Sequence, residues 1–276
     1  MKKIFIILFL FLVGIFIWLM FFKPKLLQVV FFDVGQGDAC LITTPSGQTI
    51  LIDGGPGRSL LTKLGQQMPW HKRTIDVVIL THPHADHLAG LLEVLKRYKV
   101  RLVLWTGVLH TSPEYLTWLK IIKEKNISAR TIEAGQKIIL ESVILETIWP
   151  EGSLAGQTVV DLNASSLVIR LVYLKTALLL TGDINQTEEE LILAAGRLIE
   201  AQIIKIAHQG SSTSSSLEFL RAVKPVWAVI SVGDNNYGHP HKIIMDRLKK
   251  LFIKILRTDK LGDIEFRSDG KIWQPL

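Results

Sequence analysis

The feature that most constrains the fold is an apolar run that ends in a cluster of histidines. Residues 75–80 read Ile-Asp-Val-Val-Ile-Leu, and the next seven residues read Thr-His-Pro-His-Ala-Asp-His. A run of this kind is typical of a buried strand, which holds its last residues rigidly. Imidazoles and carboxylates just beyond such a strand can turn toward one point and bind a metal ion. The sequence therefore predicts a metal site, rather than a histidine-rich polar turn, with candidate ligands His82, His84, Asp86 and His87.

The length and composition fit one large globular core. The chain has 276 residues, of which 48% are hydrophobic and 21% are charged. Its single cysteine, Cys40, excludes an internal disulfide and a zinc site built from cysteines. The formal net charge of +7 indicates either a surface that attracts anions, such as nucleic acid, lipid headgroups or phosphoesters, or an ordinary solvated basic face.

The N-terminal segment has the pattern of a membrane anchor. Residues 4–22 are apolar and uncharged, and lysines flank them on both sides. The run ends in Trp-Leu-Met-Phe-Phe, without the small residues of a signal-peptide cleavage site. We therefore predict an uncleaved transmembrane helix in residues 1–25 and one globular domain in residues 26–276. A slight excess of positive charge before the span predicts a single-pass membrane protein with the globular domain on the extracytoplasmic face.

The rest of the chain predicts an α/β sandwich. Short apolar runs between residues 27 and 52, joined by Gly-rich turns, indicate an antiparallel start. Residues 87–99 and 113–125 have helical periodicity, strand-like runs return between residues 127 and 180, and helices then alternate with strands to residue 257. Strand runs followed by alternating units in each half predict two sheets packed face to face with helices outside.

Polar donors also follow three later apolar strands. The leucines at 178–180 lead into Asp183, the run at 203–207 leads into His208, and the run at 227–231 leads into a loop that reaches His239. In α/β sheets, ligands gather outside the carboxyl ends of strands. Asp183 has a competing explanation as a helix cap, and His208 as a satisfied core histidine. Together with the histidine cluster, they nevertheless supply six candidate ligands, enough for two ions.

These residues resemble a known family. The histidine cluster, Asp53 in Leu-Ile-Asp-Gly-Gly, Asp183 in Leu-Thr-Gly-Asp, and His208 resemble the metallo-β-lactamase superfamily. More narrowly, Phe-Asp-Val-Gly-Gln-Gly-Asp at 32–38 and Asn-Ala-Ser-Ser-Leu-Val at 163–168 resemble the hydrolase domain of ComEC-type competence proteins of DNA uptake. The resemblance implies an αββα sandwich preceded here by one transmembrane helix, and a centre of two divalent ions, zinc or manganese, between the sheets.

The resemblance also implies how the ligands are shared. It assigns six residues to the two ions: His82 and His84 to the first, Asp86, His87 and His208 to the second, and Asp183 as a bridge. Where a further histidine would complete the first site, this sequence offers Asp161 or Asn163 as a weaker oxygen ligand. Gln209 stands where relatives commonly have another histidine, and we expect it to be a dispensable neighbour of His208.

The expected chemistry is hydrolysis. Two divalent ions lower the pKa of a bound water from about 16 to about 7, so that hydroxide is available at neutral pH. We expect Asp86 to act in catalysis by binding one ion and orienting the hydroxide. His239 either donates a proton or contacts phosphate near the leaving group, or only braces a Gly-His-Pro turn.

Four further residues are candidates for supporting or substrate contacts. We expect Asp53 to orient the histidine loop through hydrogen bonds. Asp33 and Asp38 lie in a Gly-rich loop, where they either face the site or form Asx turns. Ser211 opens a serine-rich tract whose amides either cradle a phosphate or cap a helix.

Three functions are compatible with the sequence. The leading prediction is a membrane-tethered, metal-dependent phosphodiesterase or nuclease that acts on nucleic acid and is linked to the DNA-uptake machinery. The same centre also suits hydrolysis of a lactone, thioester or β-lactam. The third possibility is a non-catalytic, metal-stabilised module that binds DNA or a protein partner.

Overall fold

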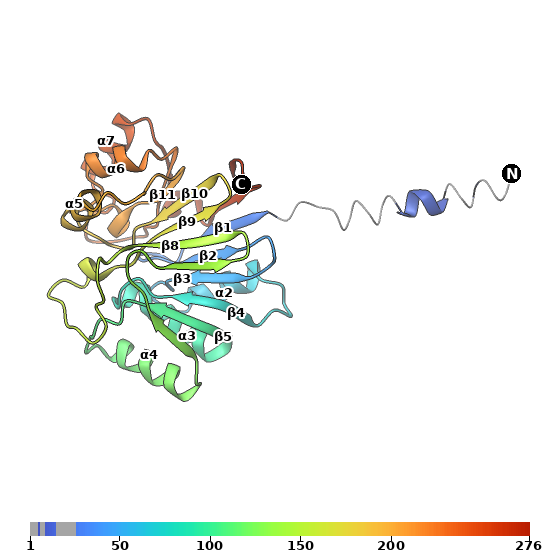
Figure 1. Ribbon diagram of the computed structural model, residues 1–276, viewed down its shortest axis with the longest axis horizontal. Coiled ribbons are helices and arrows are strands. Elements are labelled where there is room, and N and C mark those ends of the chain that lie inside the picture. Colours follow the sequence, from blue (N-terminus) through green and yellow to red (C-terminus); the bar gives the residue numbers. More distant parts are fainter. Residues whose placement is uncertain (1–4, 6–8, 15–25) are drawn as a thin grey trace.

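Two β-sheets pack face to face, and helices cover the outer face of each, which confirms the predicted sandwich (Figure 1). The computed structural model describes residues 5, 9–14 and 26–276. In the first sheet the strand order is β15 (Trp273–Pro275), β14 (Ile264–Ser268), β1 (Leu27–Phe31), β2 (Cys40–Thr43), β3 (Thr49–Ile52), β4 (Thr74–Ile79), β5 (Lys99–Trp105) and β6 (Ser128–Thr131). In the second it is β13 (Lys254–Arg257), β12 (Trp227–Ile230), β11 (Ile203–Lys205), β10 (Thr176–Leu180), β9 (Val168–Tyr173), β8 (Val143–Trp149) and β7 (Lys137–Leu140).

The helices divide between the two outer faces. Three pack on the first sheet: α2 (Ser59–Gln67), α3 (Ala85–Arg97) and α4 (Pro113–Glu124). Three pack on the second: α5 (Gln186–Ala194), α6 (Leu217–Val223) and α7 (Lys242–Lys250). The part of the chain from residue 26 onward also contains a short α8 (Thr258–Leu261) and two 3₁₀ turns, η1 (Asn163–Ser165) and η2 (Ala207–Gly210).

Three apolar layers hold the sandwich together. On β1, Leu27 and Phe31 face the second sheet, whereas Val30 faces the helices of the first. This alternation follows from the two-residue period of a strand, and it leaves both faces of each sheet apolar. The outer layer of the second sheet contains residues such as Ile204 and Phe219.

Parallel pairing brings the functional loops to one edge. Strand β3 runs parallel to β4, with Ile52 opposite Ile79, so Asp53 and the histidine loop emerge side by side. Strand β10 runs parallel to β11, with Leu180 opposite Lys205. Since both pairs end at the same edge of the sandwich, the candidate ligands can meet between the sheets.

Helix α2 and strands β14 and β15 were not predicted. Helix α2 is nine residues long, buries only Leu60 and Leu64, and begins at Arg58 without a side-chain cap. Its apolar spacing is helical but extends over only two turns, and no capping residue marks its start. Strand β14 pairs with β1, more than 200 residues away along the chain, and this long-range pairing leaves no local sequence signal.

The predicted single-pass membrane protein, with its catalytic domain outside the cytoplasm, is contradicted. Among the described residues, no helix has both the length and the apolar character needed to cross a membrane. Most of the predicted anchor lies outside the described residues.

Candidate metal centre

The histidine loop is held rigidly between β4 and α3. Asp53, which follows β3, accepts hydrogen bonds from the backbone amide of Thr81 (2.8 Å) and from its hydroxyl (2.7 Å). The same carboxylate lies 2.9 Å from Nδ1 of His87, which is fully buried in the first turn of α3. One carboxylate therefore fixes both the start of the loop and the orientation of an imidazole at its end.

The imidazoles converge with Asp183. Nε2 of His82 lies 2.9 Å from Nδ1 of His84, and the rings of His82 and His87 are 4.2 Å apart between centroids. Nε2 of His87 lies 3.2 Å from Oδ2 of Asp183, which follows β10. One donor atom from each of His82, His87 and Asp183 lies within 4.8 Å of the other two. The structure therefore brings strand ends from both sheets to one point.

Gly182 allows Asp183 to reach this point. Its φ of +51° lies in the left-handed region, and a Cβ atom there would come within 2.8 Å of Cβ of Ser166. The hydroxyl of Ser166 accepts a hydrogen bond from the Asp183 amide (3.1 Å). A larger residue at 182 would therefore displace the carboxylate.

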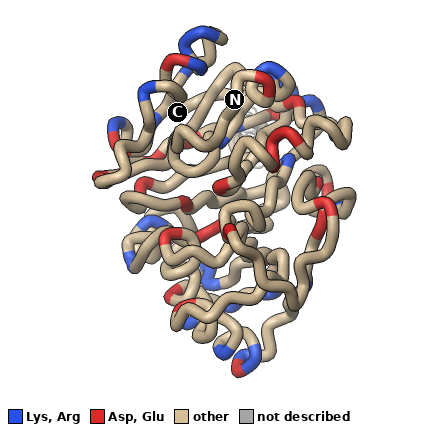
Figure 2. The backbone as a smooth tube through the Cα atoms, turned by 90° about the vertical axis from the view of Figure 1, so that its left-hand side faces the viewer, with Lys and Arg blue, Asp and Glu red and all other residues tan. Residues whose placement is uncertain are grey.

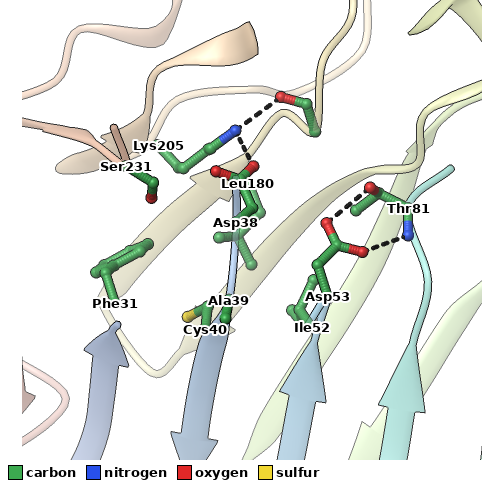
Figure 3. Close-up of a pocket in the computed structure, with 11 residues that line it drawn as sticks. Phe31, Asp38, Ala39, Cys40, Ile52, Asp53, Thr81, Leu180, Lys205 and Ser231 are labelled. Atoms are coloured by element: carbon green, nitrogen blue, oxygen red, sulfur yellow. Dashed lines mark hydrogen bonds and ion pairs between the residues drawn. The ribbon is translucent and has the colours of Figure 1, made fainter. Parts of the chain in front are cut away.

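A buried lysine, Lys205, which we did not predict, contacts Asp38 (Figure 3). Nζ of Lys205 contacts the Asp38 carboxylate, Oδ1 of Asp183 (3.3 Å) and the Gly182 carbonyl (3.0 Å). Burial raises the pKa of Asp38 to about 6, although Lys205 opposes the shift. Burial disfavours the charge on Lys205, but Asp38 and Asp183 outweigh it and raise its pKa. Lys205 is thus a permanent internal cation.

The two aspartates of the Gly-rich loop have different positions. Asp33 accepts a hydrogen bond from the Gly35 amide (3.3 Å), as in an Asx turn. Asp38 is buried beside Lys205, and its Oδ2 lies 3.9 Å from Nδ1 of His87. Only Asp38 of this pair faces the site.

The candidate oxygen ligands of the first ion also differ. Asp161 is exposed and accepts hydrogen bonds from the Asn163 amide (2.9 Å) and the Asn185 side chain (2.8 Å). Oδ1 of Asn163 is buried and has no hydrogen-bond partner among the described residues. The backbone just after η1 is joined to the histidine loop by a hydrogen bond from the Leu167 amide to the Thr81 carbonyl (3.0 Å). Of these two candidates, Asn163 is therefore the one whose side-chain oxygen has no hydrogen bond within the described part of the chain.

Gln209, expected to be dispensable, lies inside the site. Its side chain is buried, and its amide nitrogen lies 3.0 Å from Oδ2 of Asp86 and 3.3 Å from Oδ2 of Asp183. Nδ1 of the adjacent His208 is buried and has no hydrogen-bond partner within the described part of the chain. The sequence favoured His208 as the ligand because it directly follows the apolar strand, and Gln209 was therefore expected to be a dispensable neighbour.

A cavity of about 480 Å³ opens onto this centre. It is lined by Gln36, Pro56, His84, Ala85, Asp86, Asp183, His208, Gln209, Tyr237 and His239. The ring of His239 lies 5.4 Å from that of His208 between centroids, and its Nδ1 lies 3.5 Å from Nε2 of Gln36. Burial, with help from His208 and His241, lowers the pKa of His239 to about 4, so this imidazole is neutral at pH 7.

The serine-rich tract caps a helix. Ser216 is the N-cap of α6, and its hydroxyl accepts a hydrogen bond from the Phe219 amide (3.2 Å). The buried carboxylate of Glu189 already accepts hydrogen bonds from the Ser215 and Ser216 amides (2.5 and 2.7 Å). Ser211 lies earlier in this loop, with its hydroxyl 3.0 Å from that of Thr213. The Ser215 and Ser216 amides are therefore not available to cradle a phosphate.

The donor set fits divalent metal ions. Burial, with help from His87, lowers the pKa of His82, so its imidazole is neutral and able to bind a metal. Burial would raise the pKa of Asp183, but His87 and Lys205 outweigh it and keep the carboxylate ionised. The short His82–His84 contact, and the buried atoms of Asn163 and His208 that lack a partner among the described residues, are typical of metal ligands.

Comparisons with known proteins agree with this geometry. The family described as "Metallo-beta-lactamase superfamily" matches residues 32–234. Among solved structures, the metallo-beta-lactamase fold protein YhfI from Bacillus subtilis is 11% identical, with a TM-score of 0.58, and the match covers 88% of this chain and 100% of that one. At this identity the likeness concerns the fold alone.

Two curated relatives match most of the chain. ComE operon protein 3 of Bacillus subtilis is 28% identical over 269 residues, covering 89% of this chain and 33% of that protein. Competence protein ComA of Neisseria gonorrhoeae is 31% identical over 241 residues, covering 86% and 32%. The chain thus spans about a third of the length of these relatives.

Proposed function

Because the chain belongs to the metallo-β-lactamase superfamily of metal-dependent hydrolases, we propose that it cleaves phosphodiester bonds, with nucleic acid as the substrate. The proposed ligands are His82, His84, Asp86, His87 and Asp183, with His208 predicted as a sixth. When bound, two divalent ions, zinc or manganese, supply Lewis acidity and a water of low pKa.

The observation that carries the proposal is the cavity beside the ligands. Asp86, Asp183 and His239 all line it. A substrate in this space would meet a carboxylate that can orient water and a neutral imidazole that can contact a phosphate oxygen or the leaving group.

An exposed aromatic ring favours nucleic acid among the possible esters. Tyr237 lines the cavity, yet 71% of its surface is exposed. Asn235 holds its loop: its side-chain oxygen accepts hydrogen bonds from the Tyr237 and His239 amides (3.1 and 3.0 Å). A fixed and exposed ring beside a phosphodiester site is suited to stack on a nucleobase.

The charge distribution gives weaker support. In the view of Figure 2, Lys and Arg positions are spread around the periphery with Asp and Glu positions among them. The net charge of +7 would attract nucleic acid generally, without a single basic stripe in this view. The names of the curated relatives support a link to DNA uptake, in which this chain would supply the hydrolytic part.

The test is turnover by the full-length chain. Metal-free protein is loaded with Mn²⁺ or Zn²⁺ and assayed with bis-p-nitrophenyl phosphate, single-stranded DNA, a lactone and a chromogenic β-lactam. We expect cleavage of the first two, which a chelator abolishes and added metal restores. Cleavage of the lactone or β-lactam alone would replace the proposal with the second enzymatic alternative. Salt-sensitive DNA binding without turnover would instead support a binding module.

A further inference from the structure

We infer that Gln36 is a positioning residue that sets the tautomer of His239, so that the proton of this imidazole lies on Nε2. This role rests on the proposed function, in which His239 contacts substrate. It also gives the Gly-rich loop at residues 32–38 a part in the site. Gln36 and His239 both line the cavity beside the proposed ligands.

The loop that carries Gln36 is fixed between the two sheets. On one side, the Asp38 amide donates a hydrogen bond to the Asp86 carbonyl (3.3 Å) in the histidine loop. On the other side, the loop packs against Gly233, which follows β12. A Cβ atom on Gly233 would lie 2.7 Å from the backbone nitrogen of Gln36, so only glycine allows this approach. The Gln36 backbone is therefore held from both sides.

Hydrogen bonds fix which end of the Gln36 amide is the donor. Oε1 of Gln36 accepts a hydrogen bond from the Gly233 amide (3.2 Å), and a backbone amide can only donate. Nε2 of Gln36 donates to Oε1 of Gln209 (2.5 Å). Nε2 of Gln209 in turn lies 3.0 and 3.3 Å from carboxylate oxygens of Asp86 and Asp183, which accept when ionised. The direction of this chain of amides is therefore set at both ends.

The same nitrogen of Gln36 determines the state of the His239 ring. It lies 3.5 Å from Nδ1 of His239, at the long limit of a hydrogen bond, and such contacts often shorten only when substrate is bound. A primary amide nitrogen carries two hydrogens and can only donate, so Nδ1 must be the accepting, unprotonated nitrogen of a neutral imidazole. The proton of the ring then lies on Nε2.

The surroundings of His239 leave Nε2 as the nitrogen for substrate. The Asn235 side chain holds the His239 backbone, because it accepts a hydrogen bond from the amide (3.0 Å) and donates one to the carbonyl (3.0 Å). The rings of His208 and His241 lie 5.4 and 5.0 Å from the His239 ring between centroids. With Nδ1 beside Gln36, an Nε2–H can donate to a phosphate oxygen or to the leaving group, whereas the other tautomer would present a lone pair.

The first measurement is the tautomer itself, and it needs no turnover. The full-length chain with ¹⁵N-labelled histidine is studied by long-range ¹H–¹⁵N NMR, metal-free and loaded with Zn²⁺, and His239→Ala identifies the His239 signals. We expect a proton on Nε2 and none on Nδ1 at pH 7. In Gln36→Glu, which keeps the shape but places an acceptor there, the proton should move to Nδ1. A proton on Nδ1 in the native chain, or an unchanged tautomer in Gln36→Glu, would overturn the inference.

Kinetics with bis-p-nitrophenyl phosphate test whether Gln36 acts through His239. Gln36→Met keeps the length but removes the donor, so kcat should fall about tenfold while KM changes by less than about threefold. In the His239→Ala background, the same substitution should lower kcat by less than about twofold, because the group on which it acts is gone. An equal fall in both backgrounds would mean that Gln36 acts elsewhere and would overturn its positioning role.

The matched control is Gln66, an exposed glutamine on α2. Gln66→Glu and Gln66→Met make the same chemical changes away from the site and should leave the His239 tautomer and kcat unchanged. If a Gln36 variant folds poorly, the tautomer of the native chain still decides the outcome. The expected tautomer and its shift in Gln36→Glu, without phosphodiester turnover by the native chain, would support the positioning of His239 and refute only the proposed function.

Discussion

The interior and cavity sides of the metal centre are built differently. On the interior side, Asp38, Asp53 and Lys205 are buried, and each contacts at least two other polar groups of the site. On the cavity side, the Asp86 side chain is 34% exposed and the Tyr237 ring 71% exposed. The interior side therefore fixes charge and ligand geometry, whereas the cavity side is free to contact a substrate. Changes on the first side should affect stability or metal binding, and changes on the second should affect rate or substrate binding.

The largest effect is expected at Asp183, which joins the two sides. Its Oδ1 lies 3.3 Å from Lys205 and its Oδ2 lies 3.2 Å from His87. Asp183→Asn keeps the side-chain shape but removes the charge that we propose would bridge two ions, so hydrolysis of bis-p-nitrophenyl phosphate should fall by at least about 10³-fold. Circular dichroism should show a retained fold. The exposed Asp246→Asn is the control, and unchanged turnover in Asp183→Asn would refute the bridging role.

The next effect is expected at Lys205 and concerns stability. Lys205→Met leaves Asp38 and Asp183 without their buried cation, so the free energy of unfolding of the metal-free protein should fall by about 3–5 kcal/mol. Saturating metal should reduce this loss, because the ions supply positive charge to the same carboxylates. Urea denaturation with and without metal measures both values.

The comparison between the two sides supplies the control. Lys120 is 71% exposed and pairs only with Glu124 (3.8 Å) among the described residues, so Lys120→Met should change stability by less than about 1 kcal/mol. Equal effects of the two lysine variants would mean that Lys205 does not compensate the buried carboxylates.

A smaller effect on rate is expected at His239, on the cavity side. His239 lines the cavity, and we propose that its ring contacts substrate rather than metal. His239→Ala should therefore lower kcat for bis-p-nitrophenyl phosphate about a hundredfold and leave the number of bound ions unchanged. Loss of bound metal, measured by elemental analysis, would make His239 a ligand instead.

The pH profile sharpens this prediction. The pKa of His239 is about 4, below the ordinary value of 6.5, so its imidazole gains a proton only as pH falls through about 4. If the neutral ring is required, native activity should lose the His239 contribution near pH 4 and not near pH 6.5. The alanine variant should lack that limb of the profile.

The sequence predicted the parts of the site that are contiguous. The histidine cluster directly follows an apolar strand, so its members could be predicted as one group of metal ligands: His82, His84, Asp86 and His87. The sandwich followed from the order of strand and helix periods. Asp183 could be predicted as a site residue because polar residues after three leucines indicate the end of a buried strand.

Other parts depend on contacts that no local pattern encodes. Lys205 lies within a short apolar run, and only the parallel pairing of β10 with β11 sets it beside Asp183. Asp38 reaches the same lysine from 167 positions away along the chain. The inward turn of Gln209 depends on two left-handed residues, which neither histidine nor glutamine predicts. The apolar composition of the N-terminal segment likewise predicted a spanning helix that the described residues do not contain.

The smallest effect is expected at Tyr237, on the cavity side. Tyr237→Ala should weaken binding of single-stranded DNA by about 1 kcal/mol, or roughly fivefold, because one stacked base is lost. Tyr237→Phe keeps the ring and should bind normally. An oligonucleotide with abasic sites should bind the native chain and the alanine variant equally, since neither can stack on a missing base. If Tyr237→Ala weakens abasic and normal strands alike, the ring contributes shape or backbone contact rather than base stacking, and the cavity side would no longer favour nucleic acid over other phosphodiesters.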